Sequence, residues 1–173
     1  MYLKVIGSVF LIFSAAAIGF VKAEELKCRV ERMEEMKRMM ILLQGELRFC
    51  RAVLSEAFEN VSERVEEPFS GFLSVMAKML EQRENGRFEQ IFQEQTKILL
   101  QEKGFLQEDR HLLDVLQKGL GYLDLTMQTE TLNLVIRETE ETVQQAKEQL
   151  QIKGKLYRTM GVTLGALLTL LII

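Results

Sequence analysis

The chain has 173 residues, of which 47% are hydrophobic, 27% are charged and 8% are aromatic, and its formal net charge is −3 at pH 7. This is the length of one domain. Residues 22–158 hold 21 Lys and Arg against 25 Asp and Glu, with no basic stripe, so nucleic acid is a poor candidate partner. A single Pro among many helix-favouring residues leaves little that resembles a strand, and we predict an all-α fold.

Residues 5–21 are uncharged and lie between Lys4 and Lys22. These 17 residues are at the short end of the roughly 17–25 that span a bilayer as a helix, and they predict a first transmembrane helix. A cleavable signal peptide is the alternative, because Val21 and Ala23 offer small residues at positions −3 and −1 of a cleavage site.

An apolar stripe with a mean spacing of 3.5 residues follows this run and predicts one helix that continues to about Val53. Cys28 and Cys50 would lie too far apart on that helix for an intrachain disulfide, and we interpret both as small apolar residues on its packed face. The stripe consists of Leu26, Val30, Met33, Met36, Met40, Leu43, Leu47, Cys50 and Leu54, and the opposite side carries Glu31, Arg32, Glu34, Glu35 and Arg38.

Four shorter amphipathic segments fill the middle of the chain, each bounded by a helix start or stop signal. Pro68 suits a first helical position, whereas Gly104, Gly119 and Gly121 suit helix ends or breaks. The predicted segments are 55–65, 68–83 before a stop at Asn85-Gly86, 88–102, and 107–118.

A last stripe predicts a long helix that pairs antiparallel with the first and leads into 15 uncharged residues, 159–173. This run is short for a hydrocarbon core of roughly 30 Å, but Lys155 and Arg158 can reach the headgroups, so we predict a second transmembrane helix. A buried C-terminal core helix is the alternative. The stripe consists of Leu132, Val135, Thr139, Val143, Ala146, Leu150, Gly154 and Tyr157.

Basic residues cluster on the same side of both predicted spans, and only Lys4 lies beyond them. The positive-inside rule then places residues 22–158 in the cytoplasm and residues 1–4 outside it. The predicted architecture is a six-helix bundle whose first and last helices extend into transmembrane segments at 5–21 and 159–173.

Small residues lie along both predicted spans and would let helices approach closely. They include Ala15 and Gly19 in the first span, and Gly161 and Gly165, at GxxxG spacing, in the second. The pattern leaves three interpretations open: packing of the two spans against each other, oligomerisation of the chain, or no specific role.

The sequence lacks the residue patterns of an enzyme, a metal site or a cofactor site. His111 is the only histidine, and we interpret it as a helix-surface residue because the second Glu-x-x-His step of a di-iron bundle is missing. Gly119-Leu120-Gly121 lacks the third glycine and the preceding strand of a dinucleotide loop, and no Walker motif occurs. We therefore expect no enzyme activity and no bound cofactor.

Four motifs of spaced packing residues lie between the two chain ends. They are Leu43-x-x-Glu46-Leu47-x-Phe49, Leu54-x-Glu56-Ala57-Phe58, Leu120-Gly121-x-x-Asp124-x-x-x-Gln128-x-x-x-Leu132 and Lys155-x-Tyr157-x-x-Met160-Gly161. In order and spacing, and over nearly the whole chain, they resemble the stage III sporulation protein AB family of endospore-forming Firmicutes. Phe49 departs from the pattern, since the family often has Tyr there.

The resemblance implies a fold and a setting but no catalytic residues. The implied fold is a helical domain similar to the platform protein of type II secretion and type IV pilus machines. The implied setting is the mother-cell side of the outer forespore membrane, with most of the chain in the cytoplasm. There the protein would assemble with sister proteins of the same operon, including a cytoplasmic ATPase, into a channel-like complex between mother cell and forespore.

From these features we expect a non-enzymatic, membrane-anchored structural subunit of a sporulation secretion-like complex. Two other functions fit the same sequence. A membrane-tethered helical signalling or adaptor protein would bind a regulator in place of an assembly. An exported helical protein would result from cleavage after the first hydrophobic run.

Overall fold

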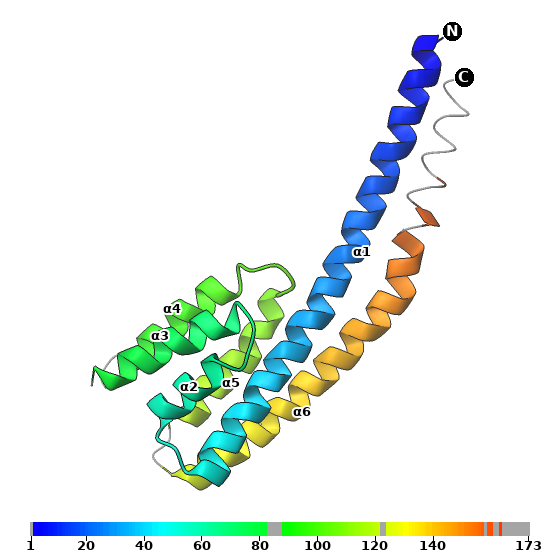
Figure 1. Ribbon diagram of the computed structural model, residues 1–173. Coiled ribbons are helices and arrows are strands. Elements are labelled where there is room, and N and C mark those ends of the chain that lie inside the picture. The colour runs from blue at the N-terminus through cyan, green and yellow to red at the C-terminus, as the bar shows by residue number, and fades with distance from the viewer. Residues whose placement is uncertain (1, 83–87, 122–123, 158, 161–162, 164–173) are drawn as a thin grey trace. The chain divides into compact units, whose positions relative to one another are not determined.

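The computed structural model describes residues 2–82, 88–121, 124–157, 159–160 and 163, and for residues 2–13, 15 and 16 it describes only the backbone. Over this part of the chain it contains six α-helices and no strand, which confirms the all-α prediction (Figure 1). In the same residues, no helix is both long and apolar enough to cross a membrane.

The helices are connected by short turns and loops. In chain order the elements are α1 (Tyr2–Gly45), the π-helical turn η1 (Glu46–Cys50), α2 (Leu54–Ser62), α3 (Phe69–Glu81), α4 (Phe88–Leu99), the 3-10 turn η2 (Gln107–Asp109), α5 (Arg110–Leu120), α6 (Leu125–Gln149) and the π-helical turn η3 (Leu150–Gly154). The predicted stop at Asn85-Gly86 lies outside the described residues.

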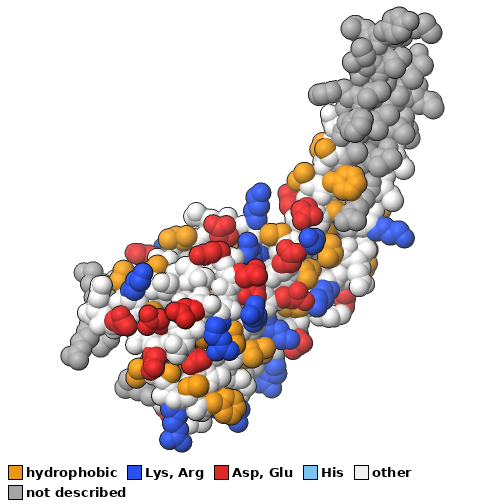
Figure 2. Space-filling model, viewed as in Figure 1, with side chains coloured by type: hydrophobic (Ala, Val, Ile, Leu, Met, Phe, Trp, Pro, Cys, Tyr) orange, Lys and Arg blue, Asp and Glu red, His pale blue; other side chains and the backbone are white. Residues whose placement is uncertain are grey.

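The chain forms two compact units. Unit 1 comprises Met1–Val30 and Gln144–Ile173, and unit 2 comprises Glu31–Val143. The predicted span at 5–21 belongs to unit 1 and falls mainly on residues described by their backbone alone, whereas the span at 159–173 falls mainly outside the described residues. On the face that Figure 2 shows, charged side chains cover much of unit 2 and hydrophobic ones lie between them.

Within unit 2, α1 and α6 pair antiparallel, as predicted. The side chain of Gln44 bonds to Asn133, Lys37 pairs with Glu140 at 2.8 Å, and the hydroxyl of Thr139 donates to the sulfur of Met40 at 3.5 Å. Residue numbers rise along one helix as they fall along the other. The buried positions of the two predicted stripes therefore face a shared core.

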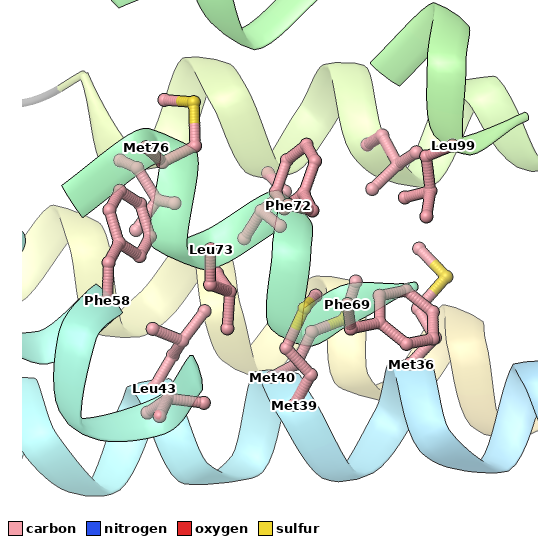
Figure 3. Close-up of a cluster of buried hydrophobic side chains, with 14 of the residues drawn as sticks. Met36, Met39, Met40, Leu43, Phe58, Phe69, Phe72, Leu73, Met76 and Leu99 are labelled. Carbon is pink, nitrogen blue, oxygen red and sulfur yellow. The ribbon is translucent and has the colours of Figure 1, made fainter. Parts of the chain in front are cut away.

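The core of unit 2 packs methionines and leucines of α1 against aromatic side chains of the shorter helices (Figure 3). Phe69 and Phe105 meet edge to face with ring centroids 5.7 Å apart, and Phe72 and Phe92 do so at 5.2 Å. The buried face of α1 is wider than the predicted stripe, because Met39 is buried beside Met40.

The prediction that the first helix continues to about Val53 is wrong. After Gly45 the helix widens into η1 and ends at Arg51, whose φ of 51° lies in the left-handed region. The chain then starts α2 at Leu54, so Leu54 is not part of the α1 stripe, and Cys50 is exposed rather than packed.

The prediction that Gly119 breaks a helix is also wrong. Gly119 lies inside α5 and is buried. A Cβ atom there would stand 2.2 Å from Cγ2 of Thr131 on α6, so only glycine allows this close approach of the two helices. Gly121 does follow the end of α5, and Gly104, with a φ of 94°, occupies a turn that favours glycine.

The charged side of α1 is partly used for packing. The Oε1 atom of Glu35 accepts the backbone N–H of Glu66 at 2.9 Å, and the guanidinium of Arg32 donates to the carbonyl of Glu67. These two side chains fasten the connection between α2 and α3 to α1.

Candidate functional site

In unit 1 the usual arrangement of large and small side chains is inverted. Apart from Val30 at its border with unit 2 in the sequence, the described residues that are buried in unit 1 are small: Gly19, Ala23, which is only 1% exposed, Ala146 and Gly154. Large hydrophobic side chains of the same unit are exposed, and Ile152 reaches 71% exposure. The exposed set is Ile18, Phe20, Val21, Ile152, Leu156 and Met160.

This inversion has a physical meaning. In water, burial of large apolar side chains is the main favourable term in folding, so a helix pair that buries glycine and alanine while exposing isoleucine and phenylalanine loses most of that term. Beside lipid tails the same arrangement is favourable, because small residues let helices approach closely and the tails solvate large side chains.

Basic residues accompany this apolar surface. Lys22, Lys153 and Lys155 are exposed. The Glu25 carboxylate lies 2.7 Å from the Lys22 ammonium, and this hydrogen bond and charge raise the pKa of Lys22 above its ordinary value. Lys22 therefore carries its charge throughout the neutral pH range.

Of the small residues proposed to pack in the membrane, one can be placed. Gly19 is buried in unit 1. The side chain of Ala15 lies outside the described part of the chain, as do Gly161 and Gly165 entirely. Helix α6 ends at Gln149 and the π-helical turn η3 follows, but residues 155–157 and 159–160 are again α-helical, so the described backbone stays helical toward the second predicted span.

In unit 2 an exposed loop combines hydrophobic and basic side chains. We call residues 48–53 the arginine loop. Phe49 is 78% exposed and Val53 is 68% exposed, while Arg48 and Arg51 are exposed beside them. The guanidinium of Arg48 lies 5.5 Å from the centre of the Phe49 ring, a cation–π contact. Figure 2 shows hydrophobic and basic side chains close together at the lower end of unit 2, where α1 ends.

Glu46 fixes the base of the arginine loop. Its carboxylate accepts hydrogen bonds from the amide of Asn60 at 3.2 Å and from the guanidinium of Arg64 at 3.0 Å. Both partners belong to α2 or to the turn after it. The first family motif therefore contains one residue that ties η1 to α2, Glu46, and one that points into solvent, Phe49. Glu56 of the second motif is exposed on α2.

The third family motif forms the turn between α5 and α6. The Oδ1 atom of Asp124 accepts the backbone N–H of Thr126 at 2.8 Å, which satisfies a free donor at the start of α6. The amide of Gln128 donates to the carbonyl of Leu120 at 3.2 Å, which satisfies a free acceptor near the end of α5. Asp124 and Gln128 are therefore turn-forming residues, together with Gly121.

A shallow groove of about 390 Å³ lies between α1 and α6 in unit 2. The hydrogen bond from Gln44 to Asn133, 2.7 Å long, belongs to its lining. Ile41 and Ile136 add hydrophobic surface, and Glu130 and Arg137 add opposite charges. The groove thus offers apolar, amide and charged groups together.

The described residues hold no grouping of His, Cys, Asp and Glu that could bind a metal ion. His111 is 73% exposed on α5 and lies 4.0 Å from the carboxylate of Glu138, which confirms that it is a helix-surface residue. Within the described residues, neither Cys28 nor Cys50 is part of a disulfide.

Sequence patterns missed the arginine loop and the groove. The apolar stripe of the first helix predicted that Cys50 and Leu54 lie on one packed helix face. The turn between these two residues was therefore not predicted. The left-handed Arg51 gives no sequence signal, because this conformation is usual for glycine or asparagine. Ile41 and Ile136 border the predicted stripes, and their partial exposure depends on the spacing of α1 and α6.

Comparison with known proteins gives one consistent result. A family model described as stage III sporulation protein AB matches residues 4–173. Stage III sporulation protein AB of Bacillus subtilis strain 168 is 22% identical to this chain over 171 residues, which cover 98% of the chain and 99% of that protein. No solved structure matches.

Proposed function

The chain belongs to the stage III sporulation protein AB family, and we propose that it acts in sporulation as a non-enzymatic, membrane-anchored structural subunit that docks partner proteins. Membership confirms the resemblance that the four motifs indicated. The membrane, the partners and the channel-like assembly are parts of the proposal.

The single observation that carries the membrane anchor is the inverted packing of unit 1. Ile18, Phe20 and Met160, which lie in the two predicted spans, are exposed while Gly19 is buried, an arrangement that favours lipid over water. The sequence carries no charged residue over 5–21 and 159–173. Exposed lysines beside these two runs suit anionic headgroups. The uninterrupted course of α1 from Tyr2 to Gly45 favours a retained anchor over a cleaved signal.

The docking role has support in the arginine loop of unit 2. Phenylalanine and arginine are both enriched in protein interfaces, and arginine is frequent among the residues that dominate the binding energy. The positive charge of Arg48 and Arg51 complements a partner segment that carries carboxylates beside apolar side chains. We propose that a sister subunit of the sporulation complex, such as its cytoplasmic ATPase, supplies this acidic segment.

Affinity purification from sporulating cells tests the docking role. The tagged full chain is compared with Phe49→Ser and with Ile98→Ser, which alters a 57% exposed residue on α4. We expect Ile98→Ser to retain the partners of the original chain and Phe49→Ser to lose at least one of them while accumulating normally. Equal recovery of every partner by both variants would contradict the docking role of the loop, and recovery of a regulator alone would favour the adaptor function.

A further inference from the structure

Two large hydrophobic side chains of unit 1 are exposed just before the second predicted span. Ile152 is 71% exposed and Leu156 is 50% exposed. Both precede Thr159, where that span is predicted to begin, so the span itself does not account for their exposure. Met160 follows Leu156 at the same interval of four residues and is 45% exposed. Residues four apart on a helix lie near one side of it, and we call these three the apolar ridge.

Two exposed lysines flank the apolar ridge. Lys153 directly follows Ile152 and Lys155 directly precedes Leu156, so their side chains leave the helix on either side of the ridge. Among the described residues, neither lysine makes an ion pair. The sequence also carries no Asp or Glu after Glu148. The positive charge beside the ridge is therefore available to an anionic ligand.

The lysines of α1 in the same unit differ in this respect. Lys22 lies 2.7 Å from the carboxylate of Glu25, and Lys27 lies 3.6 Å from that of Glu24. Carboxylates of the same helix already balance these two charges. The uncompensated lysines of unit 1 are thus the two beside the apolar ridge.

The position of these lysines suits the headgroup layer of a membrane. Lys153 lies six residues before Thr159, about 9 Å along the helix axis. Lysine side chains extend along apolar surface and hold their ammonium groups at the membrane interface. Both ammonium groups can therefore reach the phosphates of lipids whose tails contact the second predicted span.

We propose that the apolar ridge and its two lysines bind an anionic phospholipid, with the phosphate between the ammonium groups and an acyl chain along the ridge. The proposal rests on the membrane anchor of the proposed function. A lipid fits better than a free phosphate ion, which would leave Ile152 and Leu156 in water. An anionic headgroup fits better than a zwitterionic one, because no carboxylate follows Glu148 to meet a choline cation.

Fluorescence quenching by brominated lipids tests the site in the full chain. The chain contains no Trp, so Tyr157→Trp places a single fluorophore next to Leu156. The protein is reconstituted into phosphatidylcholine vesicles that contain increasing amounts of brominated phosphatidylglycerol or brominated phosphatidylcholine. We expect phosphatidylglycerol to quench at a concentration at least fivefold lower, because each basic residue near an anionic surface contributes roughly a factor of five.

Removal of the two charges tests which residues bind the lipid. In the Tyr157→Trp chain, Lys153→Gln with Lys155→Gln should lower the preference for phosphatidylglycerol at least fivefold. The matched control is Lys97→Gln with Lys118→Gln, which removes two exposed lysines from α4 and α5 and should leave the preference unchanged. Circular dichroism checks that each variant is folded.

A second fluorophore separates failure of the lipid site from failure of the anchor. Phe20→Trp, at a 56% exposed position of the first predicted span, should be quenched by both brominated lipids. Quenching there, without a phosphatidylglycerol preference at Tyr157→Trp, would overturn the lipid site and leave the anchor intact. A preference that survives loss of Lys153 and Lys155, or that the control also removes, would overturn the site as well. Absence of quenching at both positions would refute the anchor and the site with it.

Discussion

The side-chain amide of Gln44 donates to Oδ1 of Asn133 across 2.7 Å and joins α1 to α6 inside unit 2. The Lys37–Glu140 ion pair, 2.8 Å long, joins the same two helices in the same antiparallel sense. Between them in sequence lie Met40 and Thr139, which are buried and hydrogen-bonded to each other. Hydrophobic stripes bring the helices together, and the polar pairs fix their register.

The first prediction concerns the core. Leu43 is fully buried in unit 2, so Leu43→Ala should lower the free energy of unfolding by ~2–5 kcal/mol. Ile98→Ala is the control, because Ile98 is exposed and should change stability by no more than about 0.5 kcal/mol. Guanidinium unfolding of the full chain in mild detergent measures both. Equal losses would mean that the buried face of the bundle is wrongly assigned.

A second prediction concerns Glu46, which joins the end of α1 to Asn60 and Arg64. Glu46→Ala leaves these two donors without their acceptor and should cost about 1–2 kcal/mol, since one partner is half exposed. Glu56→Ala removes an exposed carboxylate from α2 and serves as the control. The same unfolding measurement compares them, and a Glu46 variant as stable as the control would argue against the tie between η1 and α2.

Opposite effects are expected when two helical glycines are replaced by alanine. Gly119→Ala forces a Cβ atom to within 2.2 Å of Thr131 and should destabilise the chain by about 1–3 kcal/mol. Gly45 has helical dihedral angles and open space around it, so Gly45→Ala should stabilise by roughly 0.5–1 kcal/mol. Thermal unfolding gives the sign of each change. A Gly119→Ala chain at least as stable as the original would contradict the close approach of α5 and α6, and a destabilising Gly45→Ala would contradict the open space around Gly45.

Topology can be tested by cysteine labelling in a chain without native thiols. The basic residues beside the two predicted spans predict that residues 22–158 face the cytoplasm. A cysteine in place of the exposed Glu63 should therefore react with an impermeant reagent only after the cell membrane is opened. A cysteine added at the C-terminus should react in intact cells with an impermeant reagent. The reverse pattern would invert the predicted orientation.

Much of the bundle followed from the sequence because its helices bury periodic apolar stripes. Met33, Met36, Met40, Leu43 and Leu47 are all buried as their spacing predicted. Periodicity failed where it ran across a turn: the stripe continues to Leu54, but the backbone reverses at Arg51. The spacing of apolar residues predicts which of them share one helix face. It does not predict where the helix ends.

The candidate surfaces were less predictable than the core. The motif that contains Glu46 and Phe49 was recognised, but two residues so close in sequence have opposite roles, one bonded to α2 and the other in solvent. Gly119 resembled a helix stop because the neighbour that requires it, Thr131, belongs to another helix. Both features depend on how helices meet, which local sequence does not specify. The similarity to secretion platform proteins stays a prediction.

The most direct measurement of the central claim is alkaline carbonate extraction of membranes from cells that produce the full chain. Carbonate releases peripheral proteins and leaves membrane-spanning ones in the pellet. If the exposed side chains of Ile18, Phe20 and Met160 face lipid, the chain will stay in the membrane pellet and leave it only with detergent. Recovery of the chain in the carbonate supernatant would contradict the anchor, and with it the proposal of a membrane-bound sporulation subunit.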